Sequence, residues 1–179
     1  TWPSRPVGTR GICAGGTEPN SNVIDYITIP TAGDATDFGD LSAVVTYVNH
    51  GTGDFTRGIC KMGGDPSNAK CEYITYASTG NAADFGDLSA GKYGVCGIGN
   101  DVFGYACGGN GVINVIDIMT IASVGDAVDF GDLTESKNES IGAANPTRGV
   151  IGGGATPSQS DVIEFFEFGT SGAGVDFGD

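Results

Sequence analysis

Aspartate is the residue type whose repetition in this chain could do chemistry. The tetrapeptide Asp-Phe-Gly-Asp occurs four times, at intervals of 45 to 47 residues, and chance does not produce such a series. Its members are Asp37, Phe38, Gly39, Asp40, Asp84, Phe85, Gly86, Asp87, Asp129, Phe130, Gly131, Asp132, Asp176, Phe177, Gly178 and Asp179. Carboxylates at equivalent positions could bind a hard cation such as calcium. We favour the alternative, in which they bond backbone amides or face solvent, because the sequence contains no EF-hand or nine-residue calcium repeat. We therefore expect no metal site and no cofactor, with calcium as the one alternative.

The same tetrapeptide contains the Asp-Phe-Gly of protein kinases, in which the aspartate binds magnesium. The chain has no glycine-rich phosphate loop and no His-Arg-Asp loop, and its 179 residues are too few for a kinase fold. Its single histidine, His50, has no Gly-x-Ser-x-Gly elbow or cysteine partner that would support nucleophilic catalysis. No unrepeated acid–base cluster stands out either. We predict that the protein is not an enzyme and has no catalytic residue.

Three of the eight basic residues also recur at a fixed place, in the tripeptide Thr-Arg-Gly. They are Arg10, Arg57 and Arg148. We expect each guanidinium to pair with an aspartate of a neighbouring strand or blade, since a bidentate contact fits that geometry. The alternative is a ligand-binding ring of arginines. Phe103 at the equivalent position of the third repeat interrupts such a ring and favours the structural role.

Five cysteines leave two interpretations open. Cys60 and Cys71 have the same separation as Cys96 and Cys107, so each pair could form a cross-strand disulfide in a hairpin. Alternatively, the thiols are small buried hydrophobic groups. A zinc site is not expected, because the chain has no Cys-x-x-Cys and one histidine.

The repeats predict short β segments. A Gly-Gly pair follows Thr-Arg-Gly in register, as at Gly15-Gly16, and an apolar run follows the pair, as in residues 23–29. Gly-Gly supplies the positive φ of a tight hairpin, and the glycine of Asp-Phe-Gly-Asp allows a bulge or a close approach between blades. In the apolar run, Ile24 and Tyr26 point one way and Ile27 and Ile29 the other. A sheet that is apolar on both faces must be covered on both.

Four strands in a unit of about 46 residues predict an all-β propeller, with minor helices at most. We place the repeats at residues 1–41, 42–88, 89–133 and 134–179 of a single domain. The weakest strand of each unit is expected after Asp-Phe-Gly-Asp, for example in residues 43–48 or 92–98. The first and last repeats could complete one blade together and close a four-bladed ring. An open piece of a larger propeller, or a stacked assembly, is the alternative.

The repeat resembles two known families. Gly-Gly after a short strand resembles kelch propellers, and Tyr26 and Tyr73 match the kelch tyrosine. The only tryptophan, Trp2, lies elsewhere, so the match is kelch-like rather than kelch proper. Residues 22–29 and 33–41 more closely resemble the Asp-Phe-Gly-Asp-Leu repeats of virion and tail structural proteins of marine bacteriophages, over nearly the whole chain. The resemblance implies a propeller fold and a structural role, and no catalytic site.

The net charge of the chain limits the kinds of partner that it can bind. The formal net charge of −14 disfavours nucleic acid and anionic membranes, and no apolar run is long enough to span a bilayer. The chain begins Thr1-Trp2-Pro3 without a methionine, so we expect a processed product or a fragment. Asn138-Glu139-Ser140 is a glycosylation sequon, which has meaning only in a glycosylating pathway.

Three functions follow as hypotheses. The first is an extracellular or virion location and a structural module of a phage tail or fibre, which binds itself or other virion proteins and contacts host-surface glycans. The second is a subunit of an extracellular microbial filament that is held by propeller–propeller contacts. A propeller enzyme, such as a lyase or glycosidase, is the third and least supported.

Overall fold

The computed structural model describes residues 8–16, 19–45, 47, 50–64, 68–111, 113–170 and 172–179. All regular elements among them are β-strands, so the all-β prediction is confirmed. The strands are β1 (Arg10–Gly16), β2 (Ser21–Thr28), β3 (Thr36–Val45), β4 (Thr52–Gly53), β5 (Arg57–Gly64), β6 (Asn68–Thr75), β7 (Ala83–Asp87), β8 (Cys96–Gly99), β9 (Phe103–Cys107), β10 (Val115–Thr120), β11 (Val128–Asp132), β12 (Ile141–Ala144), β13 (Arg148–Gly152), β14 (Ala155–Thr156), β15 (Ser158–Gln159), β16 (Ile163–Glu167) and β17 (Val175–Gly178).

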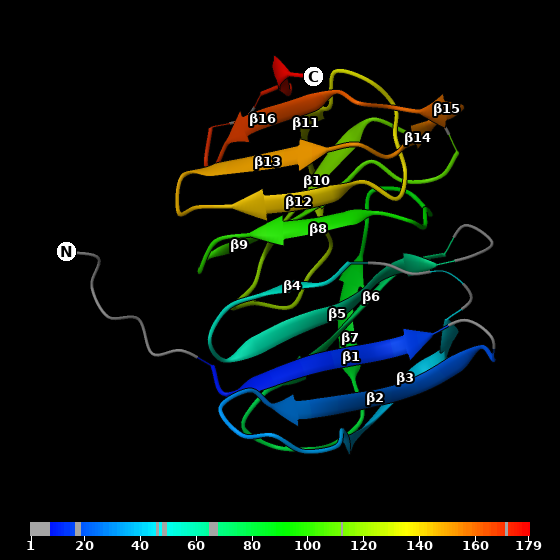
Figure 1. Cartoon of the computed structure of the whole chain (residues 1–179), viewed down its shortest axis with the longest axis vertical. Coiled ribbons are helices and arrows are strands. Elements are labelled where there is room, and N and C mark those ends of the chain that lie inside the picture. Colours follow the sequence, from blue (N-terminus) through cyan, green and yellow to red (C-terminus); the bar gives the residue numbers. More distant parts are fainter. Residues whose placement is uncertain are drawn as a thin grey trace.

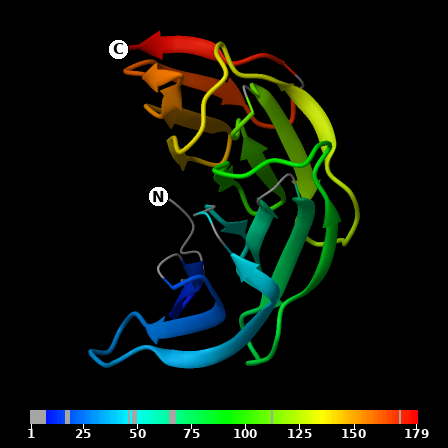
Figure 2. The ribbon, with the colours of Figure 1, turned by 90° about the vertical axis from the view of Figure 1, so that its right-hand side faces the viewer.

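These strands form four successive antiparallel sheets, one for each repeat. Sheet 1 has the order β1-β2-β3, sheet 2 β4-β5-β6-β7, sheet 3 β8-β9-β10-β11 and sheet 4 β12-β13-β16-β17, and β14 and β15 form a separate hairpin. The first strands of neighbouring sheets contact each other, β4 with β8 and β8 with β12. The sheets follow one another along an open arc, in which sheets 1 and 4 lie at opposite ends (Figures 1 and 2). The architecture is propeller-like and not closed.

Two expectations about the placement of strands differ from the structure. The last repeat completes a sheet of its own, and no strand of sheet 4 pairs with sheet 1 among the described residues. The weakest strand also lies later than expected for the second repeat. Residues 43–45 continue β3, and the inner strand of sheet 2 is β4 at Thr52–Gly53. The equivalent strand of sheet 3, β8, does overlap the predicted segment 92–98, whereas Thr46 and Val48 of the other predicted segment lie outside the described residues.

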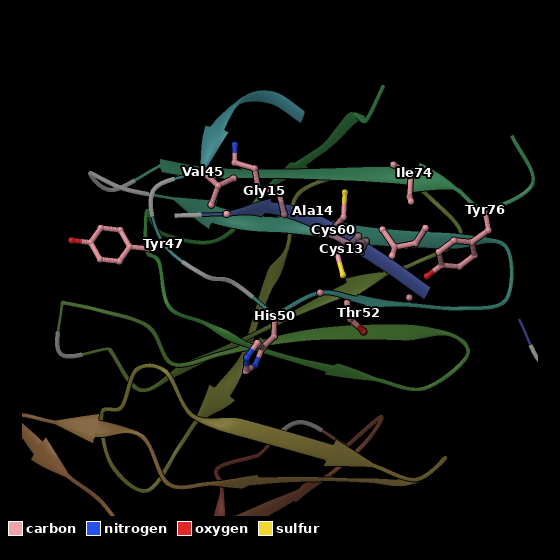
Figure 3. Close-up of a pocket in the computed structure, with 17 residues that line it drawn as sticks. Cys13, Ala14, Gly15, Val45, Tyr47, His50, Thr52, Cys60, Ile74 and Tyr76 are labelled. Carbon is pink, nitrogen blue, oxygen red and sulfur yellow. The ribbon is translucent and has the colours of Figure 1, made fainter. Parts of the chain in front are cut away.

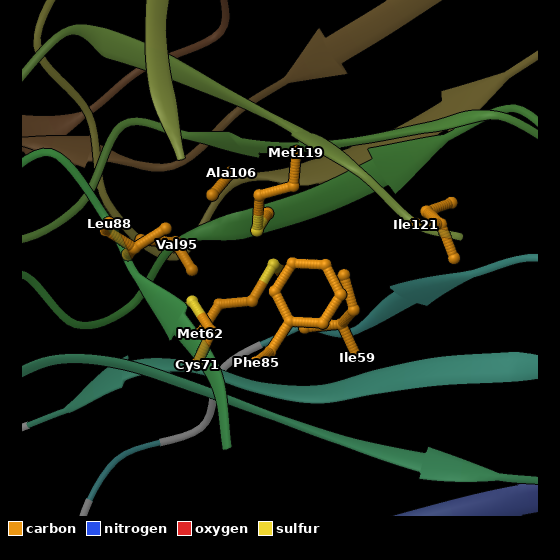
Figure 4. Packing of buried hydrophobic residues seen from close by; sticks show 9 residues of the cluster. All are labelled: Ile59, Met62, Cys71, Phe85, Leu88, Val95, Ala106, Met119 and Ile121. Atoms are coloured by element: carbon orange, nitrogen blue, oxygen red, sulfur yellow. The ribbon is translucent and has the colours of Figure 1, made fainter. Parts of the chain in front are cut away.

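Apolar side chains fill the space between neighbouring sheets. Between sheets 1 and 2, Ile24, Phe38, Leu41 and Val45 pack with Ile74. Between sheets 2 and 3 the core consists of Ile59, Met62, Cys71, Phe85, Leu88, Val95, Ala106, Met119 and Ile121 (Figure 4). A third cluster joins sheets 3 and 4 around Tyr105, Phe130 and Phe166. Burial of a side chain of this size stabilises a fold by roughly 1.5–3 kcal/mol, so these interfaces hold the arc together.

Candidate functional site

The Asp-Phe-Gly-Asp motif lies at the outer edge of each sheet and contains a β-bulge. In sheet 1, Ile24 pairs with Gly39 and Asp25 with Asp37, so Phe38 is the extra residue. The same shift recurs opposite Cys71, Ile116 and Ile163 in sheets 2 to 4. The bulge turns Phe38, Phe85 and Phe130 into the cores between sheets, where they are buried. The motif phenylalanine therefore packs between sheets in three of the four copies.

Backbone hydrogen bonds lock each of these motifs onto the next sheet. Between sheets 1 and 2, the Gly80 amide donates to the Phe38 carbonyl at 2.7 Å and the Ala82 amide to the Asp40 carbonyl at 2.8 Å. The Asp40 amide donates to Asn81 Oδ1 at 3.0 Å. Two of these bonds join main-chain groups and the third uses the Asn81 side chain, so a loop of Gly-Asx-Ala supplies all three.

The interface between sheets 2 and 3 repeats all three bonds. Gly125 donates to Phe85, Ala127 to Asp87, and the Asp87 amide to Asp126 Oδ1. Between sheets 3 and 4, Gly174 donates to the Asp132 carbonyl at 2.6 Å. The motif is thus a connector between sheets.

The motif position requires glycine for a second reason besides the bulge. Gly39, Gly86 and Gly131 have φ of +149°, +133° and +157°, which disfavours other residues. A Cβ at each position would lie 2.2–2.4 Å from the carbonyl oxygen of the next sheet's loop glycine. The expected close approach of neighbouring sheets is therefore present.

The motif aspartates have local roles. Asp84 Oδ1 accepts from the Gly86 amide at 3.2 Å, and Asp176 Oδ1 from the Gly178 amide at 2.9 Å, as expected of aspartate in a turn. Among the described residues, no three histidine, cysteine, aspartate or glutamate side chains lie together in a way that could hold a metal ion.

The predicted arginines contact the next sheet through carbonyls rather than aspartates. Arg10 donates to the Tyr76 carbonyl and Arg57 Nη1 to the Ile121 carbonyl at 2.9 Å. Each guanidinium also lies over an aromatic ring of its own sheet; the distance from Arg57 to the Tyr73 ring is 4.3 Å. The expected aspartate partner is therefore wrong for these two arginines, which donate to a carbonyl just after a strand of the next sheet.

Arg148 differs, because the contacts described for it lie within its own sheet. It stacks on Phe165 at 4.2 Å and pairs with Glu167 of the neighbouring strand.

Buried ion pairs at the sheet interfaces were not expected from the sequence. Lys61 lies 3.1 Å from Glu72, Lys92 3.0 Å from Asp117 and Lys137 2.9 Å from Glu164, and all six side chains are buried. The acids occupy one position of the second long strand in their sheets. That periodicity was a visible signal. Lys92 and Lys137 also occupy equivalent positions in successive linkers, whereas Lys61 is on β5.

The acid also binds the preceding sheet. Glu72 accepts from the Ser42 amide at 2.8 Å and from its hydroxyl, and Glu164 accepts from the Thr134 amide at 2.6 Å. Burial raises the pKa of Glu72, but the hydrogen bonds from Ser42 and Lys61 outweigh it and hold that pKa below its usual value. The carboxylate is therefore charged and fixed at neutral pH.

All five cysteines are free thiols in the structure. Cys71 lies opposite Met62, and Cys60 is the unpaired residue of a bulge between Ile59 and Lys61, so the register of β5 and β6 does not bring the two cysteines together and the first possible disulfide is absent. Cys96 does lie directly opposite Cys107, as the hairpin spacing predicts, although the two are not bonded. Burial raises the pKa of Cys60, Cys71 and Cys96 to about 12. These thiols are therefore small buried apolar groups, which was the alternative interpretation.

The sequon residue Asn138 lies in the linker between sheets 3 and 4. It is half-buried, and its backbone bridges to Ala155.

A groove of about 640 Å³ runs between sheets 1 and 2. Among the described strands, β1 pairs on one edge only, with β2, whereas β5, β9 and β13 pair on both. The groove lies along this free edge, and Cys13, Tyr47, His50, Thr52 and Tyr76 are among its lining residues (Figure 3). Tyr47 is partly exposed and stacks on Tyr93 with 4.4 Å between ring centroids.

No family model matches the chain, and no curated protein is significantly similar to it in sequence. Within the part of the chain that the structure describes, no helix has the length and apolar character needed to cross a membrane.

Proposed function

We propose that this protein is a non-enzymatic structural module with β-propeller architecture, used in an extracellular fibre or virion. One observation carries the proposal: the polar residues that recur with the repeat contact neighbouring sheets of the same chain. Arg10 and Arg57, the Asp40 and Asp87 backbones, Glu72 and Glu164 all contact the adjoining sheet or the linker to it. A repeat selected for ligand chemistry would direct such groups into a cavity instead.

The resemblance to phage tail repeats makes a tail or fibre component the first form of this proposal. Immunogold labelling of the native source with an antibody against the chain tests it. Label on capsid-bearing particles would support a virion protein, and label confined to headless fibres would exclude one.

A filament subunit is the second candidate, and the free ends of the arc favour it. Sheets 1 and 4 do not meet, so each presents a face that the other sheets bury. The same labelling experiment separates the two candidates, because a microbial filament carries label along headless fibres.

Glycan contact belongs to the first candidate and would use the groove. Its concave shape and the partly exposed Tyr47 suit stacking on a sugar ring. Binding on a glycan array that is lost in Tyr47→Ala would support this role, and an array without signal would remove it.

A further inference from the structure

The two ends of the arc carry complementary halves of one interface that the chain forms three times internally. We propose that sheet 4 of one copy docks on sheet 1 of a second copy, head to tail, through the contacts that join neighbouring sheets. This inference rests on the proposed structural function and specifies how such a module assembles.

Among the described residues, no sheet covers the face of sheet 1 that corresponds to the face by which sheets 2, 3 and 4 each contact the preceding sheet; we call it the receiving face. Ile27 and Ile29 are 46% and 62% exposed. The residues equivalent to Ile27 are Ile74, Met119 and Phe166, and each is buried against the preceding sheet. The equivalents of Ile29 also pack in those cores; Ile121 is fully buried. The first sheet therefore exposes two isoleucines that its own repeat pattern is built to cover.

Sheet 4 has the matching donating face. Phe177 is 61% exposed, although Phe38, Phe85 and Phe130 at the same position are buried. Ile141 on β12 is 69% exposed, whereas its equivalent Cys96 on β8 is fully buried. Large apolar groups exposed together at a sheet face indicate a contact surface.

The hydrogen-bonding groups match as well. Gly33-Asp34-Ala35 of sheet 1 is equivalent to Gly80-Asn81-Ala82 and to Gly125-Asp126-Ala127, the loops that receive the motif of a preceding sheet. The three residues are exposed. In the assembly we expect the Gly33 and Ala35 amides to donate to the Phe177 and Asp179 carbonyls, and the Asp179 amide to donate to Asp34.

Gly178 retains the geometry of the internal interfaces without their contact. Its φ is +144°, close to the values at Gly39, Gly86 and Gly131. A Cβ on those three would strike the next sheet, but a Cβ on Gly178 would meet nothing within 4 Å. The bulge of sheet 4 therefore has the conformation of the internal bulges, and no loop of the described residues contacts it.

A second copy is the occupant that these observations select. The receiving loop, the apolar positions and the bulge all correspond residue by residue to the chain's own internal interfaces. Sheets 1 and 4 of one copy lie at opposite ends of the arc and cannot fill each other (Figure 2). Because the two faces differ, the contact is heterologous, and repetition gives a closed ring or a helical filament.

Two variants separate the faces. Ile29→Glu places a charge on the receiving face, and Gly178→Ala places a methyl on the donating face. The matched controls are Val128→Glu, at a similarly exposed valine of β11, and Gly16→Ala, at a glycine of similar positive φ with open space around it. Circular dichroism first establishes that all four fold.

Sedimentation velocity across a hundredfold concentration range then measures assembly. We expect wild type and both controls to form rings or polymers, and Ile29→Glu and Gly178→Ala each to sediment as monomers. A mixture of these two variants should form a one-to-one dimer, because each supplies the face that the other lacks.

A mixture that stays monomeric, a wild type that is monomeric throughout, or a variant that assembles like wild type would overturn the proposal. None of these results tests the proposed structural function itself. Immunogold labelling of the native source tests that function.

Discussion

Glycine at the motif bulge does two jobs that substitution can separate. Gly86 combines a positive φ with a carbonyl 2.4 Å from the place of a Cβ, and Gly178 has the φ alone. We expect Gly178→Ala to lower the free energy of unfolding by the backbone strain alone, roughly 1–3 kcal/mol. Gly86→Ala should lower it by clearly more. Urea unfolding at a concentration where the chain is monomeric measures both. Equal losses would show that the contact with the next sheet adds nothing.

The buried thiols predict a loss of stability in alkali. Burial raises the pKa of Cys71 from 9.0 to about 12, so its thiol ionises first in the unfolded chain. The stability it contributes is complete below pH 9 and falls between pH 9 and 12, by up to about 1.4 kcal/mol per pH unit.

Cys71→Val removes this titration while placing a branched apolar side chain where the other repeats have isoleucine. The midpoint of urea unfolding should therefore fall less between pH 8 and 10.5 in Cys71→Val than in wild type. Cys13→Val, at an exposed thiol, is the control and should follow wild type. Parallel curves for all three proteins would contradict the assigned burial of Cys71.

At the scale of the elements, buried ion pairs fix the linkers onto the sheets. Lys137 pairs with Glu164, which also accepts from the amide of Thr134. Lys137→Met leaves a buried carboxylate without its cation, and we expect a loss of about 3–5 kcal/mol. Replacing both members, in Lys137→Met/Glu164→Leu, should recover most of it, since no uncompensated charge remains. Thermal unfolding of the two variants checks this, and a double variant no more stable than the single one would refute the account.

At the scale of the whole molecule, charge opposes assembly. Each copy carries a formal −14, and the proposed contact brings copies together across Asp34 and Asp179. Because the screening length falls from about 30 Å at 0.01 M salt to about 3 Å at 1 M, association should tighten as sodium chloride is raised. Sedimentation at the two salt concentrations measures it. Weaker association at high salt would indicate a contact made by charge pairs instead of the apolar residues.

Much of the local structure could be predicted from the sequence. The recurrence of Asp-Phe-Gly-Asp located the outer strands and their bulges, and the alternation in residues 23–29 assigned Ile24 and Ile27 to opposite faces. Both succeed because strand pleat and turn geometry depend on residues a few positions apart.

The relation between sheets was settled only by tertiary structure. The sequence left a closed ring, an open piece and a stacked assembly as alternatives. The curvature of the arc depends on how side chains pack across each interface, and no single repeat contains that information. The partners of Arg10 and Arg57 are carbonyls 64 to 66 residues away, and the lysines that neutralise Glu72 and Glu164 come from non-equivalent positions. Repetition determined what each unit presents to its neighbours, and long-range packing decided which of those surfaces remain exposed at the ends.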